Sequence, residues 1–267
     1  QVAAMDLGIS GKVAFVAGAT RGMGRASAEI LAQEGARVAV VARGREGVEE
    51  TVEAIRRTGG EAIGVVGDLT TRDGVEKSVR AVSEELGQPE IVLGQTTDVS
   101  FGHFDDIADE DFERVFHILT MSQIYLARAT IPAMRKRGWG RFIHIAAVVV
   151  KEPCFSLPHM LHNTVRPSAG AFLRSLSHEA ARDGVTVNIV APGWVITPTF
   201  INYWKDERGM TLEDACGWVL ENDPIPAGRL GTSEEAGAVV AFLASQQAAY
   251  ITGELIAVDG GRHRYAF

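Results

Sequence analysis

The stretch that decides the fold is KVAFVAGATRGMG, residues 12–24, in which a short apolar run leads into a glycine-rich turn. Residues 12–17 are apolar after the first lysine, as expected of a buried strand. Gly18, Gly22 and Gly24 then allow a tight turn, and the backbone N–H groups of such a turn can approach a pyrophosphate at the start of a helix. The order of strand, glycine turn and helix predicts a dinucleotide-binding unit.

The same alternation continues outward from this stretch to the end of the chain. Further apolar runs predict strands near 36–42, 61–68, 90–94, 141–148, 186–192 and 253–261. The segments between them predict helices near 45–57, 71–86, 109–136, 158–182 and 232–244. Continuous apolar strands separated by helices indicate an α/β fold of the doubly wound Rossmann type. We expect one domain with a seven-stranded parallel sheet and helices on both faces.

The domain is expected to span residues 5–267, because a chain of 267 residues suits one large α/β domain. Residues 194–230, here called the lid segment, interrupt the alternation and are expected to carry two or three short helical pieces. Long segments beside a sheet edge often cover the substrate. Met5 is expected to be the natural start, with residues 1–4 left over from expression.

Composition excludes several classes of partner. The net charge of -8 argues against a surface for nucleic acid or anionic membrane. No apolar run is long enough to span a bilayer, and no signal peptide is recognisable. Two cysteines, Cys154 and Cys216, cannot build a disulfide framework, so a cytoplasmic location is expected. The expected partner is a small-molecule substrate.

Motifs beyond the glycine turn occur in a characteristic order. Asp68 follows the third predicted strand, and PGWVITP (192–198), PIPAGRLGTSEE (224–235) and YITGELIAVDGG (250–261) come later. Together with the G-x3-G-x-G spacing, this order resembles the short-chain dehydrogenase/reductase superfamily, and within it the 3-oxoacyl-ACP reductases. The resemblance covers residues 7–262.

The resemblance implies an NADP(H) cofactor. The second strand ends in VVARGR, which offers no acidic residue for a ribose 2′-OH, whereas Arg43 and Arg21 suit a 2′-phosphate. A solvated arginine at a helix start is the alternative for Arg43. By resemblance, Asp68 binds the adenine amino group. The implied cofactor residues are Gly18, Thr20, Arg21, Gly22, Met23, Gly24, Arg43, Asp68, Leu69, Pro192, Gly193, Ile196 and Thr197.

All four catalytic positions of the family carry different residues here. A gapless count back from VNIVAPG places His162 at the family's tyrosine and Arg166 at its lysine. Ala147 stands at the serine, and Leu119 at the supporting asparagine. The turn after the fourth strand reads GQTT at 94–97 in place of NNAG, and Asp98 follows it.

These replacements change the available chemistry. Ala147 cannot donate a hydrogen bond, and Leu119 cannot position a water. Arg166 keeps its charge and can polarise an oxyanion, while His162 can exchange protons near neutrality, with a pKa that a neighbouring arginine lowers. His144 occupies the asparagine place of the family's NISS strand end. The predicted catalytic residues are His162, Arg166, His144 and Asp98.

Three functions remain open at this point. His162 as a base beside Arg166 as an anion-binding group favours non-redox chemistry. The reactions considered are retro-aldol cleavage, elimination or hydrolysis of a small carbonyl or hydroxy compound. Aromatic side chains at 200–218 favour an aromatic substrate if they face it. The retained nucleotide half supports an atypical NADPH-dependent carbonyl reductase with His162 as proton donor. The third function is a catalytically silent NADP(H)-binding protein.

The sequence gives weaker signals for a bound metal and for the quaternary structure. No established metal motif is present, and the weak candidates for a divalent metal are His103, His144, His162 and Asp98. His117 and His144 are more simply structural. The family resemblance implies a homo-oligomer, most simply a tetramer, that pairs the helix near 109–136 and uses the C-terminal RHRYAF in a second interface.

Overall fold

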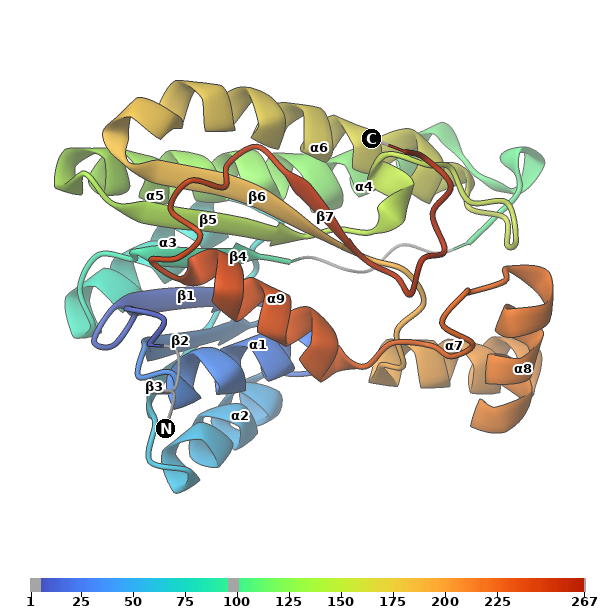
Figure 1. The fold of residues 1–267 in the computed structure, drawn as a ribbon, viewed down its shortest axis with the longest axis horizontal. Coiled ribbons are helices and arrows are strands. Elements are labelled where there is room, and N and C mark those ends of the chain that lie inside the picture. Colours follow the sequence, from blue (N-terminus) through green and yellow to red (C-terminus); the bar gives the residue numbers. More distant parts are fainter. Residues whose placement is uncertain (1–5, 96–100, 267) are drawn as a thin grey trace.

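A seven-stranded parallel sheet runs through the centre of the molecule (Figure 1). The structure is a computed structural model that describes residues 6–95 and 101–266. The strand order is β3-β2-β1-β4-β5-β6-β7, which confirms the predicted Rossmann-type sheet. The strands are β1 (Val13–Ala17), β2 (Arg37–Ala42), β3 (Glu61–Val66), β4 (Ile91–Gly94), β5 (Gly140–Ile145), β6 (Val185–Pro192) and β7 (Leu255–Val258).

Helices cover both faces of this sheet, with α1, α2 and α9 on one face and α3, α5 and α6 on the other (Figure 1). The helices α7 and α8 lie beyond the carboxyl ends of the strands, within the lid segment. The α-helices of the described chain are α1 (Gly22–Gln33), α2 (Arg45–Arg57), α3 (Arg72–Glu85), α4 (Asp109–Phe116), α5 (Ser122–Arg137), α6 (Met160–Ala180), α7 (Pro198–Arg208), α8 (Leu212–Asn222) and α9 (Ser233–Ala244).

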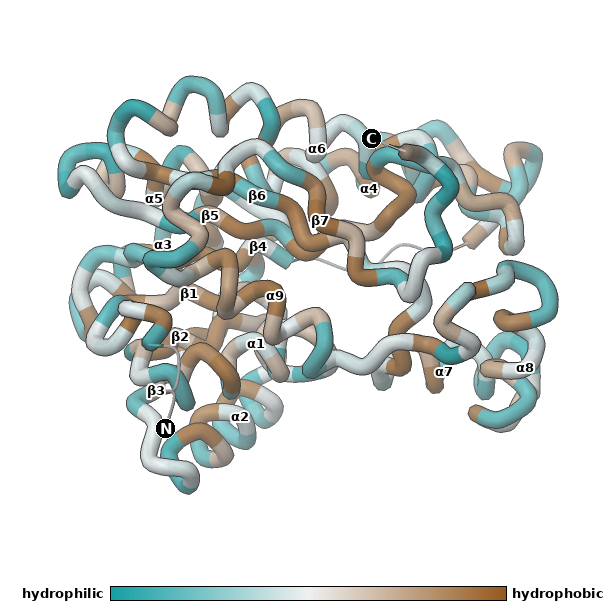
Figure 2. Tube along the Cα trace, in the orientation of Figure 1, coloured by the Kyte–Doolittle hydropathy of each residue, from teal (hydrophilic) through white to brown (hydrophobic). Residues whose placement is uncertain are grey.

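Two apolar layers hold the helices to the sheet. Successive side chains of a strand point to opposite faces, so a continuously apolar strand fills both layers. In β1, Val16 packs on the α1 and α9 side with Leu31, whereas Phe15 packs on the other side with Met134 of α5. Figure 2 shows the central strands coloured mainly as hydrophobic. This arrangement explains why the strands lack the polar alternation of a half-exposed sheet.

The sheet order reverses between β1 and β4, and this point positions the site. β1 pairs with β2 on one side and with β4 on the other. Ligands of open α/β sheets bind at such a switch point, outside the carboxyl ends of the strands. The glycine turn after β1 lies there, and the lid segment faces the same edge (Figure 1).

The predicted helix near 109–136 is interrupted by a π-helical turn, His117–Met121, between α4 and α5. Ser122 adapts to this turn by donating its hydroxyl to the carbonyl oxygen of Ile118 at 2.6 Å. π-turns inside helices often occur at functional sites. Leu119, at the position of the family's asparagine, lies within this turn. Among the described helices, none is long and apolar enough to cross a membrane.

Candidate cofactor cleft and active site

The turn after β1 depends on glycine at three positions. Gly18 and Gly22 adopt positive φ angles of 62° and 53°, in the region that favours glycine. A side chain on Gly24 would collide with the carbonyl oxygen of Gly18. α1 begins at Gly22 with no acidic residue in its first turn, so its N-terminus is suited to an anion.

A cleft of about 500 Å³ opens beside this turn. Its lining includes Gly18, Thr20, Arg21, Gly22, Met23, Arg43, Asp68, Leu69 and Thr197, all of which the sequence predicts to contact the cofactor. Gly24 lies beneath the turn. Pro192, Gly193 and Ile196 do not line the described cleft and instead lead the chain from β6 to Thr197.

The charges at the cleft suit a dinucleotide phosphate. Arg21 and Arg43 are exposed and lie on the cleft wall. Asp68 accepts hydrogen bonds from the backbone N–H and the hydroxyl of Thr70, at 3.0 and 2.8 Å, which orients its carboxylate. The glycine turn, the free helix N-terminus and the two arginines together fit an NADP-type cofactor.

His162 and Arg166 stand one turn apart on α6 and contact each other directly. Nε of Arg166 donates a hydrogen bond to Nδ1 of His162 at 3.1 Å. A ring nitrogen that accepts this bond carries no proton, so the neutral imidazole holds its proton on Nε2. The structure therefore assigns His162 as a donor through Nε2.

Arg166 is a buried cation. Its side chain is 9% exposed, and no carboxylate of the described residues lies within ion-pair distance of it. Burial lowers the pKa of Arg166 to about 10, so the guanidinium remains charged at neutral pH. A buried charge with no counterion among the described residues favours binding of an anion or a developing alkoxide.

Two further buried imidazoles surround this pair. Nδ1 of His144, on β5, donates to the carbonyl oxygen of Gly94 at 2.8 Å. Burial and the charge of Arg166 lower the pKa of His144 to about 4. His159 precedes α6, and its Nδ1 donates to the carbonyl oxygen of Leu157 at 2.8 Å. Burial lowers its pKa as well. Both rings are therefore neutral at pH 7.

The positions of the family's serine and asparagine offer no polar group here. Ala147 follows β5, and Leu119 is 2% exposed in an apolar cluster with Val115, Leu161 and Val165. This cluster packs α4 and the π-turn against α6. The side chains at these two positions therefore cannot hydrogen-bond to a substrate oxygen.

Two of the remaining predicted site residues, His103 and His117, are not part of this cluster. His103 is exposed before a short 3-10 helix, and His117 is exposed in the π-turn. Asp98 and the replaced glycine at Thr97 lie outside the described residues. The described part of the chain holds no group of three or more His, Cys, Asp or Glu placed to bind a metal.

Aromatic side chains lie beside His162, and the sequence did not predict them. The ring of Phe101 stacks on His162 with centroids 5.1 Å apart, and Tyr203 of α7 contacts Phe101 at 4.7 Å. His159 approaches His162 edge-on at 5.5 Å. The three-residue spacing of the two histidines was a usable signal for His159. Phe101 gives no such signal, because it is 61 residues from His162 in the sequence.

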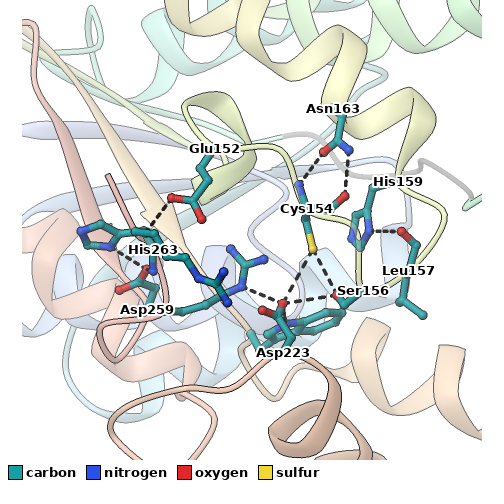
Figure 3. Close-up of polar contacts among 12 residues, drawn as sticks. Glu152, Cys154, Ser156, Leu157, His159, Asn163, Asp223, Asp259 and His263 are labelled. Carbon is teal, nitrogen blue, oxygen red and sulfur yellow. Dashed lines mark hydrogen bonds and ion pairs between the residues drawn. The ribbon is translucent and has the colours of Figure 1, made fainter. Parts of the chain in front are cut away.

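The structure also contains a polar cluster centred on Asp223 that the sequence did not predict (Figure 3). Oδ2 of Asp223 accepts from Nε1 of Trp194 and Nε of Arg262, both at 2.7 Å. It also accepts from the Ser156 hydroxyl at 3.3 Å and the Cys154 thiol at 3.7 Å. These residues come from distant segments of the chain, so no local motif marks them.

Known proteins provide an independent comparison. The family model described as Enoyl-(Acyl carrier protein) reductase matches residues 18–263. The chain is 34% identical over 265 residues to versicolorin reductase stcU of Emericella nidulans, covering 96% of this chain and 97% of the relative. It is 31% identical to the 3-oxoacyl-[acyl-carrier-protein] reductase FabG of Vibrio cholerae, covering 96% and 99%. The chain belongs to the short-chain dehydrogenase/reductase family.

A solved structure of this family agrees closely with the fold. L-Sorbose reductase from Gluconobacter frateurii, complexed with NADPH and L-sorbose, has a TM-score of 0.91 and 31% identity. The match covers 98% of this chain and 100% of that one. The overall likeness therefore includes both the cleft and the lid segment.

The comparisons correct the main functional prediction. The relatives are named reductases, so the expectation of retro-aldol, elimination or hydrolysis chemistry is wrong. This family member is an oxidoreductase, and the lyase-like alternative has no support. This expectation gave too much weight to the replacement of the family's four catalytic side chains. The cleft formed by the glycine backbone is retained, and His162 and Arg166 still provide a donor and a cation.

Proposed function

We propose that this protein is an NADP(H)-dependent reductase of a carbonyl group on a small apolar or aromatic substrate. The observation that carries the proposal is the 3.1 Å hydrogen bond from Arg166 to Nδ1 of His162. This bond places a proton on Nε2, at the ring position that replaces the family's tyrosine. The names of the relatives and the NADPH complex of L-sorbose reductase support the same reaction class.

The nucleotide half would hold the cofactor through its backbone and two arginines. The N–H groups of the glycine turn bind pyrophosphate, and Arg21 and Arg43 pair with the 2′-phosphate. Thr197 lines the same cleft, next to Gly22 of the glycine turn. When bound, the reduced cofactor supplies the hydride.

His162 and Arg166 would stabilise the charge that forms on the substrate oxygen. Nε2–H of His162 donates a hydrogen bond to the carbonyl, as a neutral imidazole can in other enzymes. As the carbonyl carbon accepts hydride, its oxygen becomes an alkoxide and takes the Nε2 proton. The guanidinium of Arg166 stabilises the negative charge left on the ring until water returns a proton. Neither step requires the missing serine or lysine.

The substrate would lie against aromatic side chains. Phe101, Trp194 and Tyr203 surround the two histidines at the start of α6. Such rings favour a flat, apolar molecule over a small polar one.

The decisive experiment follows the hydride. Purified protein is incubated with deuterium-labelled NADPH and a panel of aryl ketones and quinones, and the products are analysed by mass spectrometry. We expect deuterium on the carbinol carbon together with loss of NADPH absorbance. Failure of NADPH to bind in calorimetry, or consistently unlabelled products, would rule the proposal out.

We also propose that the protein is a homo-oligomer, most simply a tetramer, in the cytoplasm. A groove of about 510 Å³ between α4 and α6 is lined by Phe112, Phe116 and Val165, and Phe116 is 39% exposed. Exposed apolar side chains in a groove favour association. Both cysteines are free, as in a reducing compartment. Light scattering at the monomer mass of 28.7 kDa would contradict the oligomer.

A further inference from the structure

The proton donor of the proposed reductase is covered in this structure. Nε2 of His162 is buried, and His162 is not among the residues that line the cofactor cleft. The ring of Phe101 stacks on His162 with centroids 5.1 Å apart, and the ring of His159 approaches it edge-on at 5.5 Å. A substrate carbonyl can therefore reach Nε2 only after part of this covering layer has moved.

Two ring contacts connect this covering layer to the lid segment. Tyr203 of α7 packs on Phe101 with centroids 4.7 Å apart. Trp194, at the start of the lid segment, packs on His159 at 6.2 Å. The lid segment thus supports both of the rings that lie against His162. Moving the lid segment away would remove that support.

The helices α7 and α8 pack on each other and stand apart from the sheet (Figure 1). They share an apolar cluster that includes Phe200, Trp204 and Val219. Among the described residues of this cluster, Leu157 and Phe101 are the members outside the lid segment. Because so little apolar surface joins the two helices to the rest of the molecule, polar contacts have a large share in holding them closed.

Asp223, directly after α8, makes those polar contacts (Figure 3). Its Oδ2 accepts from Nε of Arg262, after β7, at 2.7 Å and from the hydroxyl of Ser156, before α6, at 3.3 Å. The same oxygen accepts from Nε1 of Trp194 at 2.7 Å, so the covering layer and the contact share one carboxylate. Within 198–223, no other side chain is hydrogen-bonded to a described residue outside the lid segment.

The partner of Asp223 is itself anchored to the body of the protein. Beyond Arg262, the backbone N–H groups of Arg264 and Tyr265 donate to the Glu152 carboxylate at 2.6 and 3.2 Å. The ammonium of Lys151 lies 4.2 Å from the centroid of the Tyr265 ring. The Arg262 side chain is only 6% exposed, so solvent and salt screen its ion pair weakly. The guanidinium is therefore a fixed point to which the lid segment is attached.

We propose that Asp223 and Arg262 form a latch that holds the lid segment closed over His162 and opens to admit the substrate. When the ion pair breaks, α7 and α8 move away from the loop before α6 and carry Trp194 and Tyr203 with them. The rings against His162 then lose their support, and Nε2 becomes accessible. Closure afterwards excludes water from the site. The inference rests on the proposed function only for the role of His162.

Chemical labelling of the histidines measures access to Nε2 without substrate or cofactor. Diethyl pyrocarbonate transfers an ethoxycarbonyl group to an accessible neutral imidazole nitrogen, and peptide mass spectrometry gives the rate at each histidine. In the wild type we expect slow labelling of His162 and fast labelling of the exposed His103. The double variant Asp223→Asn/Arg262→Met removes both charges together. It should label His162 about 10- to 100-fold faster, the factor that a charged hydrogen bond contributes to the closed state.

Two controls separate opening of the lid from loosening of the whole fold. His144 lies in β5 and is 3% exposed, so its labelling should stay slow in the double variant. Lys12→Met/Glu90→Gln removes another ion pair, of 3.0 Å, beside the amino ends of β1 and β4. This variant should leave the rate at His162 unchanged. An equal increase at His144 and His162, or faster labelling of His162 in the Lys12 variant, would overturn the latch.

A milder variant covers the case in which the double variant fails to fold. Ser156→Ala removes one donor to Asp223 without leaving a charge unpaired, and should label His162 about 2- to 10-fold faster. Wild-type labelling of His162 as fast as that of His103 would overturn the inference. Unchanged labelling of His162 in the folded latch variants would do so as well, since the covering layer would then open without the latch.

Oxidation of NADPH by a ketone is measured separately on the same proteins. Latch-controlled labelling in a protein that transfers no hydride would refute the proposed reductase and leave the latch standing. Hydride transfer, with the same rate of His162 labelling in the wild type and the latch variants, would support the reductase and refute the latch.

Discussion

The cofactor cleft and the His162 region share one edge of the sheet, yet they depend on the sequence in different ways. In the cleft, Gly18, Gly22 and Gly24 act through the backbone, and replacing any of them would change the path of the chain. In the His162 region, single side chains on an ordinary helix provide the function. Side chains can be exchanged without moving the helix, so a family pattern can persist in one region and disappear from the other.

The largest expected effect tests whether the His162 region is functional at all. His162→Phe keeps a ring against Phe101 but removes the Nε2 donor, so we expect turnover to fall by about 10²- to 10⁴-fold. The control is His103→Phe, since the side chain of His103 is exposed. Steady-state kinetics with a ketone found by the labelling experiment provides the measurement. Full activity of His162→Phe would mean that only the cleft matters.

A second effect concerns the stability of the buried imidazoles. His144 has a pKa of about 4 in the folded protein and about 6.5 when unfolded, so the unfolded chain binds more protons between these values. The free energy of unfolding should therefore fall as the pH drops from about 6.5 to 4, by up to roughly 3 kcal/mol. Urea titrations across this range measure the loss.

His144→Asn should remove this part of the acid sensitivity, because asparagine does not titrate. His178→Asn, on the exposed side of α6, is the matched control and should leave the slope unchanged. An equal slope in the wild type and in His144→Asn would show that His144 does not set the acid limit of the region.

The third effect tests the dependence of the cleft on its backbone. Gly24→Ala places a methyl group against the carbonyl oxygen of Gly18, and overpacking of this kind costs about 1–3 kcal/mol. NADPH affinity should fall by about 10- to 100-fold in a fluorescence titration. Gly44→Ala is the control, since Gly44 lines the same cleft and its added methyl would meet open space. Similar affinities in both variants would remove the contrast between the regions.

The smallest effect concerns the charge of the cleft. Arg43 is exposed, so its pairing with a 2′-phosphate is screened by solvent and contributes up to about 1 kcal/mol, or roughly 5-fold in affinity. Arg43→Asp should weaken NADPH by at least this factor and leave NADH nearly unchanged. Arg45→Asp, at the first residue of α2 and outside the described cleft lining, serves as the control. Equal losses for NADPH and NADH would place Arg43 away from the phosphate.

The fold could be predicted because its signals are local. The apolar run before Gly18 and the periodic charges of α2 each determine one element, and α2 begins and ends at the predicted residues. The π-turn at His117–Met121 could not be predicted, since the sequence there is compatible with an ordinary helix. It depends on how α4 and α5 pack against α6.

The site was predictable where a fixed count along the chain applies. His162 and Arg166 follow from the gapless distance to β6, and their contact follows from their separation of four residues. Asp223 and Arg262 contact each other across 39 residues of chain, and Phe101 reaches His162 across 61. These contacts depend on how the lid and tail close over the sheet edge, which sequence patterns do not encode.

The tryptophans are unevenly distributed, so the intrinsic fluorescence of the protein does not report equally on all parts of the fold. Three of its four tryptophans, Trp194, Trp204 and Trp218, belong to the aromatic cluster of the lid segment. Trp139 lies instead beside Lys12 and Arg141, at 4.3 and 4.4 Å from its ring. Intrinsic emission therefore reports mainly on the lid, so a change in fluorescence on adding a ligand would register closure of the lid while most of the sheet stayed unobserved.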